Sequence, residues 1–154
     1  MASPDRKPGA LPRIAAVFAL VALAAGPGWP AEAPVSVELG VAVASNDGSR
    51  IDPQLANIRA KLKAMFDYTS YRMLDRRKRT LAIGEAGDFG LPGGRSMRVT
   101  PVPSVGNKVR LAVRIMEGPR NLLTTTLGLS RGGMVLVGGP SYQNGVLILI
   151  ISAD

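Results

Sequence analysis

The chain has 154 residues, a formal net charge of +8 at pH 7, and neither histidine nor cysteine. Without these two residue types it has no Ser-His-Asp or Cys-His triad, no disulfide, and no imidazole or thiolate ligand for zinc, copper, haem or an iron–sulfur cluster. Carboxylate, lysine or tyrosine chemistry and a hard cation bound by oxygens stay open, and an enzyme is our third alternative. We predict a protein that is not an enzyme and that has no cofactor and no metal site. The positive charge favours an anionic partner.

The first 33 residues have the three parts of a secretory signal peptide. Basic residues precede an uncharged run from Ile14 to Ala25, and Ala31-Glu32-Ala33 offers a cleavage site. The run is shorter than the ~20 residues that a membrane-spanning helix needs. We predict an exported protein, periplasmic or secreted, with residues 1–33 as signal peptide and residues 34–154 as a single β-rich domain. Cleavage after Ala25 and an uncleaved anchor are the alternatives.

Two regular patterns follow. Residues 35–44 alternate between apolar side chains and small or polar ones, which is typical of a half-buried strand. After a turn at residues 45–49, Asp52 and Pro53 are residue types that cap and begin a helix. We expect this helix to lie on a sheet, with a membrane surface as the alternative. Its apolar face consists of residues at helical spacing: Leu55, Ile58, Leu62, Met65 and Phe66.

From Tyr68 onward the sequence predicts only strands separated by turns. Glycine, proline and asparagine mark the turns at residues 87–88, 92–94, 106–107, 118–119, 131–133, 138–140 and 144–145. The expected strands are residues 68–74, 80–83, 95–102, 109–116, 123–129, 134–137 and 146–151. This order predicts a mostly β fold, formally α+β. We expect an antiparallel β-sandwich or bent meander of about seven to eight strands, with one amphipathic helix near the start of the mature domain.

The densest charge cluster is Arg76-Arg77-Lys78-Arg79. It lies between the strands predicted at 68–74 and 80–83, so we expect it at the solvated tip of a hairpin. Together with Arg72 it is our candidate patch for an anionic polymer, a lipid or a protein partner. A plain solvated surface is the alternative, and we expect no nucleic-acid partner in an exported chain.

The last predicted strand, residues 146–151, is apolar on both faces. Such a strand either lies at the centre of a two-layer core or meets a partner. We favour the central position, on which both stability and any assembly would depend. The candidate assembly residues are Val146, Ile148, Leu149 and Ile150.

Residues 124–140 combine a threonine-rich strand, a glycine turn and an apolar strand that ends in Gly138-Gly139. With residues 146–151 as a further strand, this part of about 30 residues resembles the closing part of bacterial secretins. The resemblance implies a related strand arrangement or an envelope-assembly setting, and no functional residue is carried over. We therefore predict a non-catalytic envelope or periplasmic protein that binds or assembles through protein–protein contacts, with another envelope protein or with itself. A binder of anionic envelope polymer or lipid through a basic face is the alternative.

Overall fold

The structure is a computed structural model that describes Gly9, Gly28 and residues 31–154. The uncharged run of the predicted signal peptide lies outside these residues. The described part contains eight strands and one short helical segment. In chain order they are β1 (Val35–Ser45), η1 (Pro53–Ile58), α1 (Arg59–Met65), β2 (Ser70–Leu81), β3 (Gly87–Leu91), β4 (Arg95–Val102), β5 (Lys108–Glu117), β6 (Arg120–Ser130), β7 (Gly133–Tyr142) and β8 (Gly145–Ala153). No helix in the described part is long and apolar enough to cross a membrane.

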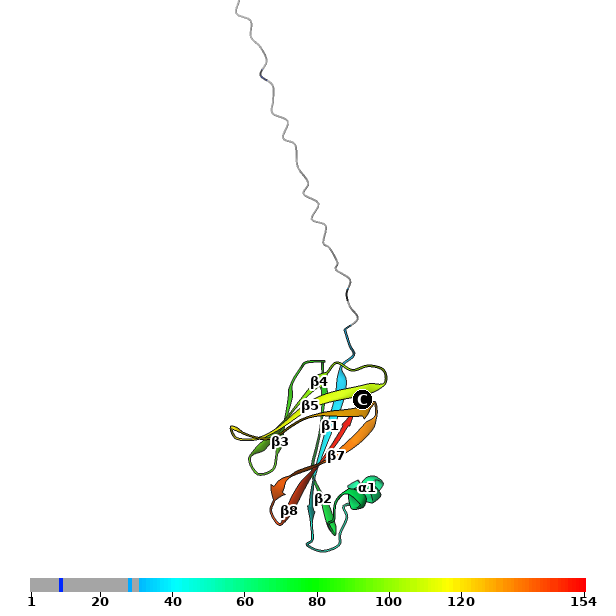
Figure 1. The fold of residues 1–154 in the computed structure, drawn as a ribbon, viewed down its shortest axis with the longest axis vertical. Helices are drawn as coiled ribbons and strands as arrows, with labels where there is room; N and C mark the ends of the chain where they lie inside the picture. Colours follow the sequence, from blue (N-terminus) through cyan, green and yellow to red (C-terminus); the bar gives the residue numbers. More distant parts are fainter. Residues whose placement is uncertain (1–8, 10–27, 29–30) are drawn as a thin grey trace, which may run out of the picture. The chain divides into compact units, whose positions relative to one another are not determined.

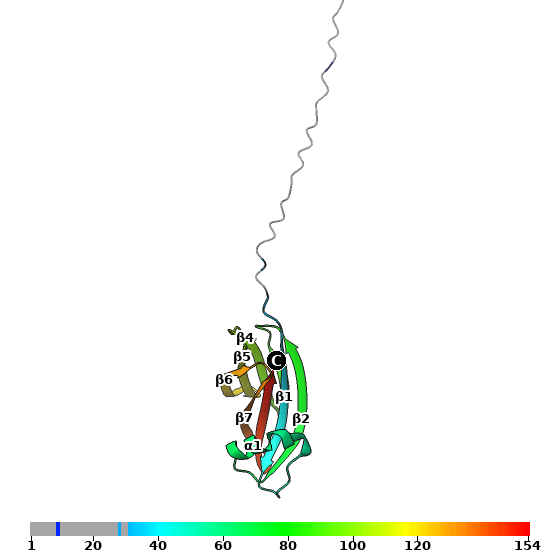
Figure 2. The same ribbon diagram turned by 90° about the vertical axis from the view of Figure 1, so that its right-hand side faces the viewer.

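The strands form two four-stranded sheets, and all neighbouring strands pair antiparallel. Sheet A has the order β2-β1-β8-β7, and sheet B has the order β3-β4-β5-β6 (Figure 1). Figure 2 shows the sheets as two layers, with α1 against sheet A. The predicted β-sandwich with one helix near the start of the domain is confirmed.

The central strand β8 of sheet A is apolar on both faces because both are covered. Its inner face packs against sheet B, and Leu147, Leu149 and Ile151 of β8 are fully buried there. Its outer face packs under the helix, where Ile148 is fully buried and Ile150 is 7% exposed. Burying side chains of this size contributes about 1.5–3 kcal/mol each. The two apolar faces of β8 therefore follow from its central position, as predicted.

The helical segment begins and packs as the sequence predicts. The Asp52 Oδ1 atom accepts a hydrogen bond from the Gln54 backbone N–H at 2.9 Å, and Pro53 follows the cap. Leu55 and Leu62 are fully buried on sheet A. Most of the predicted apolar face is thus covered by the protein itself, but Met65, which the spacing places on that face, is 54% exposed at the end of α1. The first turns are 3-10 and not α, a local difference in hydrogen bonding that apolar spacing does not reveal.

Buried Tyr71 ties β2 to the end of the helix. Its hydroxyl donates a hydrogen bond to the Phe66 carbonyl oxygen at 2.8 Å. Burial raises the pKa of this phenol above its ordinary value. The hydroxyl thus satisfies a carbonyl where the helix ends, and the aromatic ring fills the space between helix and sheet.

Two predicted turns are strands in the structure. Residues 87–88 begin β3, and residues 138–140 lie within β7. A glycine marks close packing in each case: a Cβ on Gly87 would lie 2.9 Å from Leu81, and one on Gly139 would lie 3.1 Å from Leu147. β7 accommodates its glycines through a register shift between Gly138 and Ser141. Glycine followed by a polar residue or proline therefore indicates tight contact here and not chain reversal.

Candidate binding surfaces

The basic cluster at residues 76–79 lies in the middle of a strand. β2 is continuous from Ser70 to Leu81, so the prediction of a hairpin tip is wrong. β2 is an edge of sheet A and pairs only with β1. Charged side chains on an edge strand hinder its pairing with other chains. The charge run at residues 76–79 therefore has the pattern expected of an edge strand that is protected against pairing with other chains, and not the pattern of a loop.

On the outer face of sheet A, two members of the predicted patch lie side by side. Arg76 is opposite Gly40, and Lys78 is opposite Glu38. The Arg76 Nε atom lies 3.4 Å from Glu38 Oε1, and both side chains are exposed. Exposed ion pairs of this kind contribute about 0–1 kcal/mol. This part of the patch is solvated and partly neutralised.

The other two members of the cluster lie on the side that faces sheet B. Arg77 forms an ion pair with Asp75 at 2.7 Å. The Arg79 guanidinium carbon lies 5.6 Å from the centroid of the Phe89 ring, within the range of a cation–π contact. The strand period thus divides the predicted patch between two faces, and one of its arginines covers a core aromatic ring.

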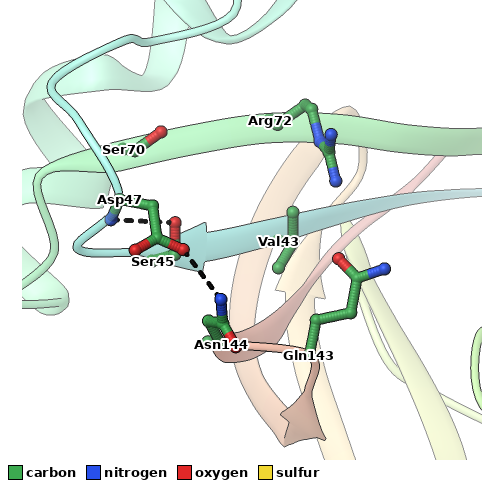
Figure 3. A pocket seen from close by; sticks show the side chains of 8 residues that line it. Val43, Ser45, Asp47, Ser70, Arg72, Gln143 and Asn144 are labelled. Atoms are coloured by element: carbon green, nitrogen blue, oxygen red, sulfur yellow. Dashed lines mark hydrogen bonds between the residues drawn. The ribbon is translucent and has the colours of Figure 1, made fainter.

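Arg72 lies away from the cluster, at a polar pocket of about 270 Å³. Its guanidinium and the Gln143 amide extend toward the space beside Val43 (Figure 3). Asn144 Nδ2 donates to Asp47 Oδ2 at 3.2 Å, which links the loop after β1 to the β7–β8 hairpin. The pocket is lined by Val43, Ser45, Asp47, Ser70, Arg72, Gln143, Asn144 and Gly145. One cation, Arg72, and one carboxylate, Asp47, lie among amides and hydroxyls, a lining that suits a small polar group.

The candidate assembly strand is internal. β8 pairs with β1 on one side and with β7 on the other, so it presents no free edge. Ile148 and Leu149 are fully buried, Ile150 is 7% exposed, and half-buried Val146 packs against the cluster beneath the helix. These four residues hold the two layers and the helix together.

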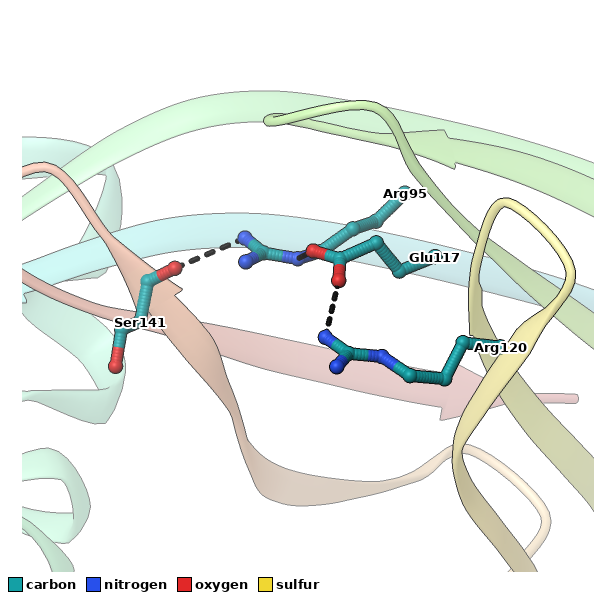
Figure 4. A network of polar contacts seen from close by, with 4 residues as sticks. All are labelled: Arg95, Glu117, Arg120 and Ser141. Carbon is teal, nitrogen blue, oxygen red and sulfur yellow. Dashed lines mark hydrogen bonds and ion pairs between the residues drawn. The ribbon is translucent and has the colours of Figure 1, made fainter.

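An ion-pair network joins the two sheets at one end (Figure 4). Arg95 Nε donates to Glu117 Oε1 at 2.9 Å, and Arg95 Nη1 donates to the Ser141 carbonyl oxygen of β7 at 2.9 Å. Arg120 pairs with the other oxygen of the same carboxylate. Hydrogen bonds from Arg120 and then Arg95 hold the pKa of Glu117 below its ordinary value. Arg95 is only 16% exposed, so this network positions the β5–β6 hairpin against β7.

The edge of β6 has a different character from that of β2. β6 is 11 residues long, pairs only with β5, and has no charged residue between Arg120 and Arg131. Its inward side chains Leu123 and Leu127 are half-buried and face the core. Two side chains of β7, Val135 and Val137, are half-buried in the same core. We call these four residues the apolar seam: Leu123, Leu127, Val135 and Val137.

Sequence reasoning assigned β6 and the start of β7 as strands but did not identify the seam. A strand pattern shows which residues alternate, whereas an edge position depends on which strands are neighbours in the sheet. The absence of charge over residues 121–130 is the one available signal. Within the part of the chain that the structure describes, no group of three or more acidic side chains is placed to hold a metal ion.

Comparisons with known proteins give one weak likeness. No family model matches the chain, and no curated protein matches it. Among solved structures, the chain is similar to the type II secretion system secretin XcpQ from Pseudomonas aeruginosa, determined by cryo-electron microscopy, with 12% identity and a TM-score of 0.35. The match covers 79% of this chain but only 55% of the secretin chain. The chain thus has a weak, partial resemblance to a secretin, too low to indicate what it does.

Proposed function

We propose that this protein is a non-catalytic envelope protein that binds or assembles with another envelope protein by strand addition at β6. The observation that carries the proposal is the uncharged edge of β6, which lies beside the apolar seam. The signal-like residues 1–33 support a position in the envelope.

The four sheet edges are protected to different degrees. β2 carries a run of four basic residues at 76–79, and β3 is only five residues long. β7 contains Pro140, which has no N–H to donate, and a register shift. β6 has a register shift at Leu122, where it pairs with Ile115 and Met116, but over 123–130 it has none of these features. A long, neutral edge with β-prone residues is a template for another strand, so β6 is the edge most suited to a partner.

The seam defines what the partner strand must present. Added strands gain affinity from backbone hydrogen bonds and specificity from alternate side chains. Side chains on one face of a strand added at β6 would lie over Leu123 and Leu127 and bury them from water. Side chains on the other face of the added strand would be exposed beside Thr124 and Thr126, the outward threonines of β6. We infer that the partner segment is extended, uncharged at its centre, and alternates between apolar and polar residues.

Site-specific photo-cross-linking in the native host tests this proposal. A benzoylphenylalanine residue is placed at exposed Thr126 of β6 or, for comparison, at Arg77 of β2. We expect Thr126 to cross-link to one envelope protein, identified by mass spectrometry, and Arg77 to give no such product. Combining Leu122→Lys with Gly128→Lys adds two charges to β6 and should abolish the cross-link. Leu122 is 36% exposed and a Cβ on Gly128 meets no atom within 4 Å, so the fold should tolerate both changes.

The matched control adds the same two charges in loops, as Val105→Lys with Ala86→Lys. These positions are exposed, and Val105 is 87% exposed. The control should retain the cross-link. The proposal fails if both edges cross-link equally, if the β6 variant retains the product, or if the only product joins two copies of this chain.

A further inference from the structure

The outer face of sheet B brings together basic side chains that the sequence does not group. Arg98 of β4 lies directly opposite Arg114 of β5, and Thr124 of β6 lies opposite Arg114 on its other side. Directly opposite residues have Cβ atoms about 4.5–5.5 Å apart, and like charges in such a pair are destabilising. Both arginines are exposed on the face that points away from the core. Two guanidinium groups therefore face each other on the solvent side of sheet B.

A hollow lies beside this pair. Ala112 lies two positions before Arg114 on β5, opposite Thr100 on β4 and Thr126 on β6. The small side chain of Ala112 leaves a depression of about 230 Å³ that is bordered by both arginines and by these threonines. Pockets for drug-sized ligands begin at about 300 Å³. The depression is thus suited to one small group.

The charge balance around the hollow is positive. Asp88 accepts two hydrogen bonds from Arg98, at 2.8 and 3.1 Å. These bonds lower the pKa of Asp88, and the nearby charges of Arg98 and Arg79 lower it further. Arg114 and Arg110 form no ion pair within residues 31–154. The Asp88 carboxylate therefore orients Arg98. The excess positive charge belongs to Arg110 and Arg114 of β5.

We propose that the hollow over Ala112 binds an anionic oxygen group of a linear anionic polysaccharide. Guanidinium groups bind sulfate, phosphate and carboxylate oxygens through paired hydrogen bonds, and the threonine hydroxyls add further donors. Lys108 and Arg110 continue along the same face of β5, so successive charges of an extended polymer meet successive cations. We name the site by four residues: Arg98, Ala112, Arg114 and Thr124.

A membrane surface fits this face less well. Binding in a lipid interface combines basic residues with apolar side chains that enter the acyl region. Within residues 31–154 the exposed large apolar residues are Met65, Val105 and Leu122, and none of them lines the hollow. The site is also separate from the β6 edge, because it uses outward side chains and not the free backbone groups of that strand.

Calorimetry of the full chain with dextran sulfate tests the site. We expect Arg114→Gln to weaken binding about tenfold, the effect of losing one charge-assisted contact. Ala112→Glu puts a negative charge into the hollow and should abolish binding. Two controls on α1 make the same changes of charge at exposed positions, Lys61→Gln and Ala64→Glu. Each control should stay within about twofold of the wild type, and circular dichroism checks the fold of every variant.

Salt dependence and lipid vesicles complete the test. Counterion release makes the affinity fall with salt, and Arg114→Gln should make that dependence less steep. The proposal is overturned if the α1 controls weaken binding as much as the site variants, because binding would then reflect net charge alone. It is also overturned if dextran sulfate does not bind, or if phosphatidylglycerol vesicles bind and dextran sulfate does not. These results are independent of the cross-linking at β6.

Discussion

Replacing Gly145 with alanine tests how closely the β7–β8 hairpin lies against β1. Gly145 begins β8 and lies opposite Ser45. A Cβ atom on Gly145 would lie 1.9 Å from the carbonyl oxygen of Ala44 and 2.9 Å from its carbonyl carbon. Real Cβ atoms essentially never show contacts under 3.0 Å. The obstacle is the backbone of the neighbouring strand, so rotation of a side chain cannot relieve the overlap.

The expected loss is large because the strands themselves must separate. Overpacking costs about 1–3 kcal/mol, and a backbone obstacle in the central strand pair places Gly145→Ala near 3 kcal/mol. A change of 1 kcal/mol corresponds to about 4 °C in Tm for a protein of this size, so Tm should fall by about 12 °C. Gly128→Ala is the matched control, because a Cβ on Gly128 has no atom within 4 Å.

Urea unfolding followed by circular dichroism measures both variants. We expect Gly128→Ala to change the free energy of unfolding by less than about 0.5 kcal/mol. A Gly145→Ala variant as stable as the wild type would refute the close approach of β8 to Ala44. Equal losses in the two variants would show that the effect belongs to glycine in strands generally and not to this contact.

Three further predictions follow from the sheets and the ion-pair network. Ile148→Lys and Leu149→Lys, made separately, should each unfold the protein by circular dichroism, since both faces of β8 are buried; one folded variant would contradict this. Changing residues 76–79 together to threonine should leave the secondary structure intact but cause self-association in light scattering, because β2 loses its edge charges; a monomeric variant would contradict their protective role. The lowered pKa of Glu117 means that its stabilising effect is present above its unfolded pKa of about 4.3 and is lost as the pH falls through its folded pKa. The difference in Tm between wild type and Glu117→Gln should therefore shrink from pH 7 to pH 3, and an unchanged difference would count against the network.

Periodic spacing of apolar residues predicts the elements that bury a whole face in a core. The alternation over residues 35–44 predicts β1, and the helical spacing of Leu55 and Leu62 predicts the helix and its buried face. The doubly apolar strand at 146–151 predicts a central position, which the structure confirms. Each of these patterns reflects burial of one or both faces of the element in a core. Such a pattern can be read from the sequence even when the neighbouring strands in the sheet are unknown.

Edge strands and surface sites depend on neighbours that the sequence does not specify. Residues 76–79 are exposed, as the sequence predicts, but loops and edge strands are both exposed, so the predicted hairpin tip is wrong. Arg98 and Arg114 are 16 positions apart in the sequence and become neighbours only through the register of β4 and β5. The hollow over Ala112 likewise needs three strands in register. No local pattern carries this information.

The pairing of β1 with β8 has a consequence for the order of folding. These are the first and last strands of the described fold, and they form the centre of sheet A. Contacts between such distant segments form slowly, because a long loop must close before they are gained. β1 lacks one of its two strand partners until β8 has been synthesised, and an unpaired strand edge favours aggregation during that time. Because β8 contributes side chains to both core clusters, neither core is complete before the last strand is available.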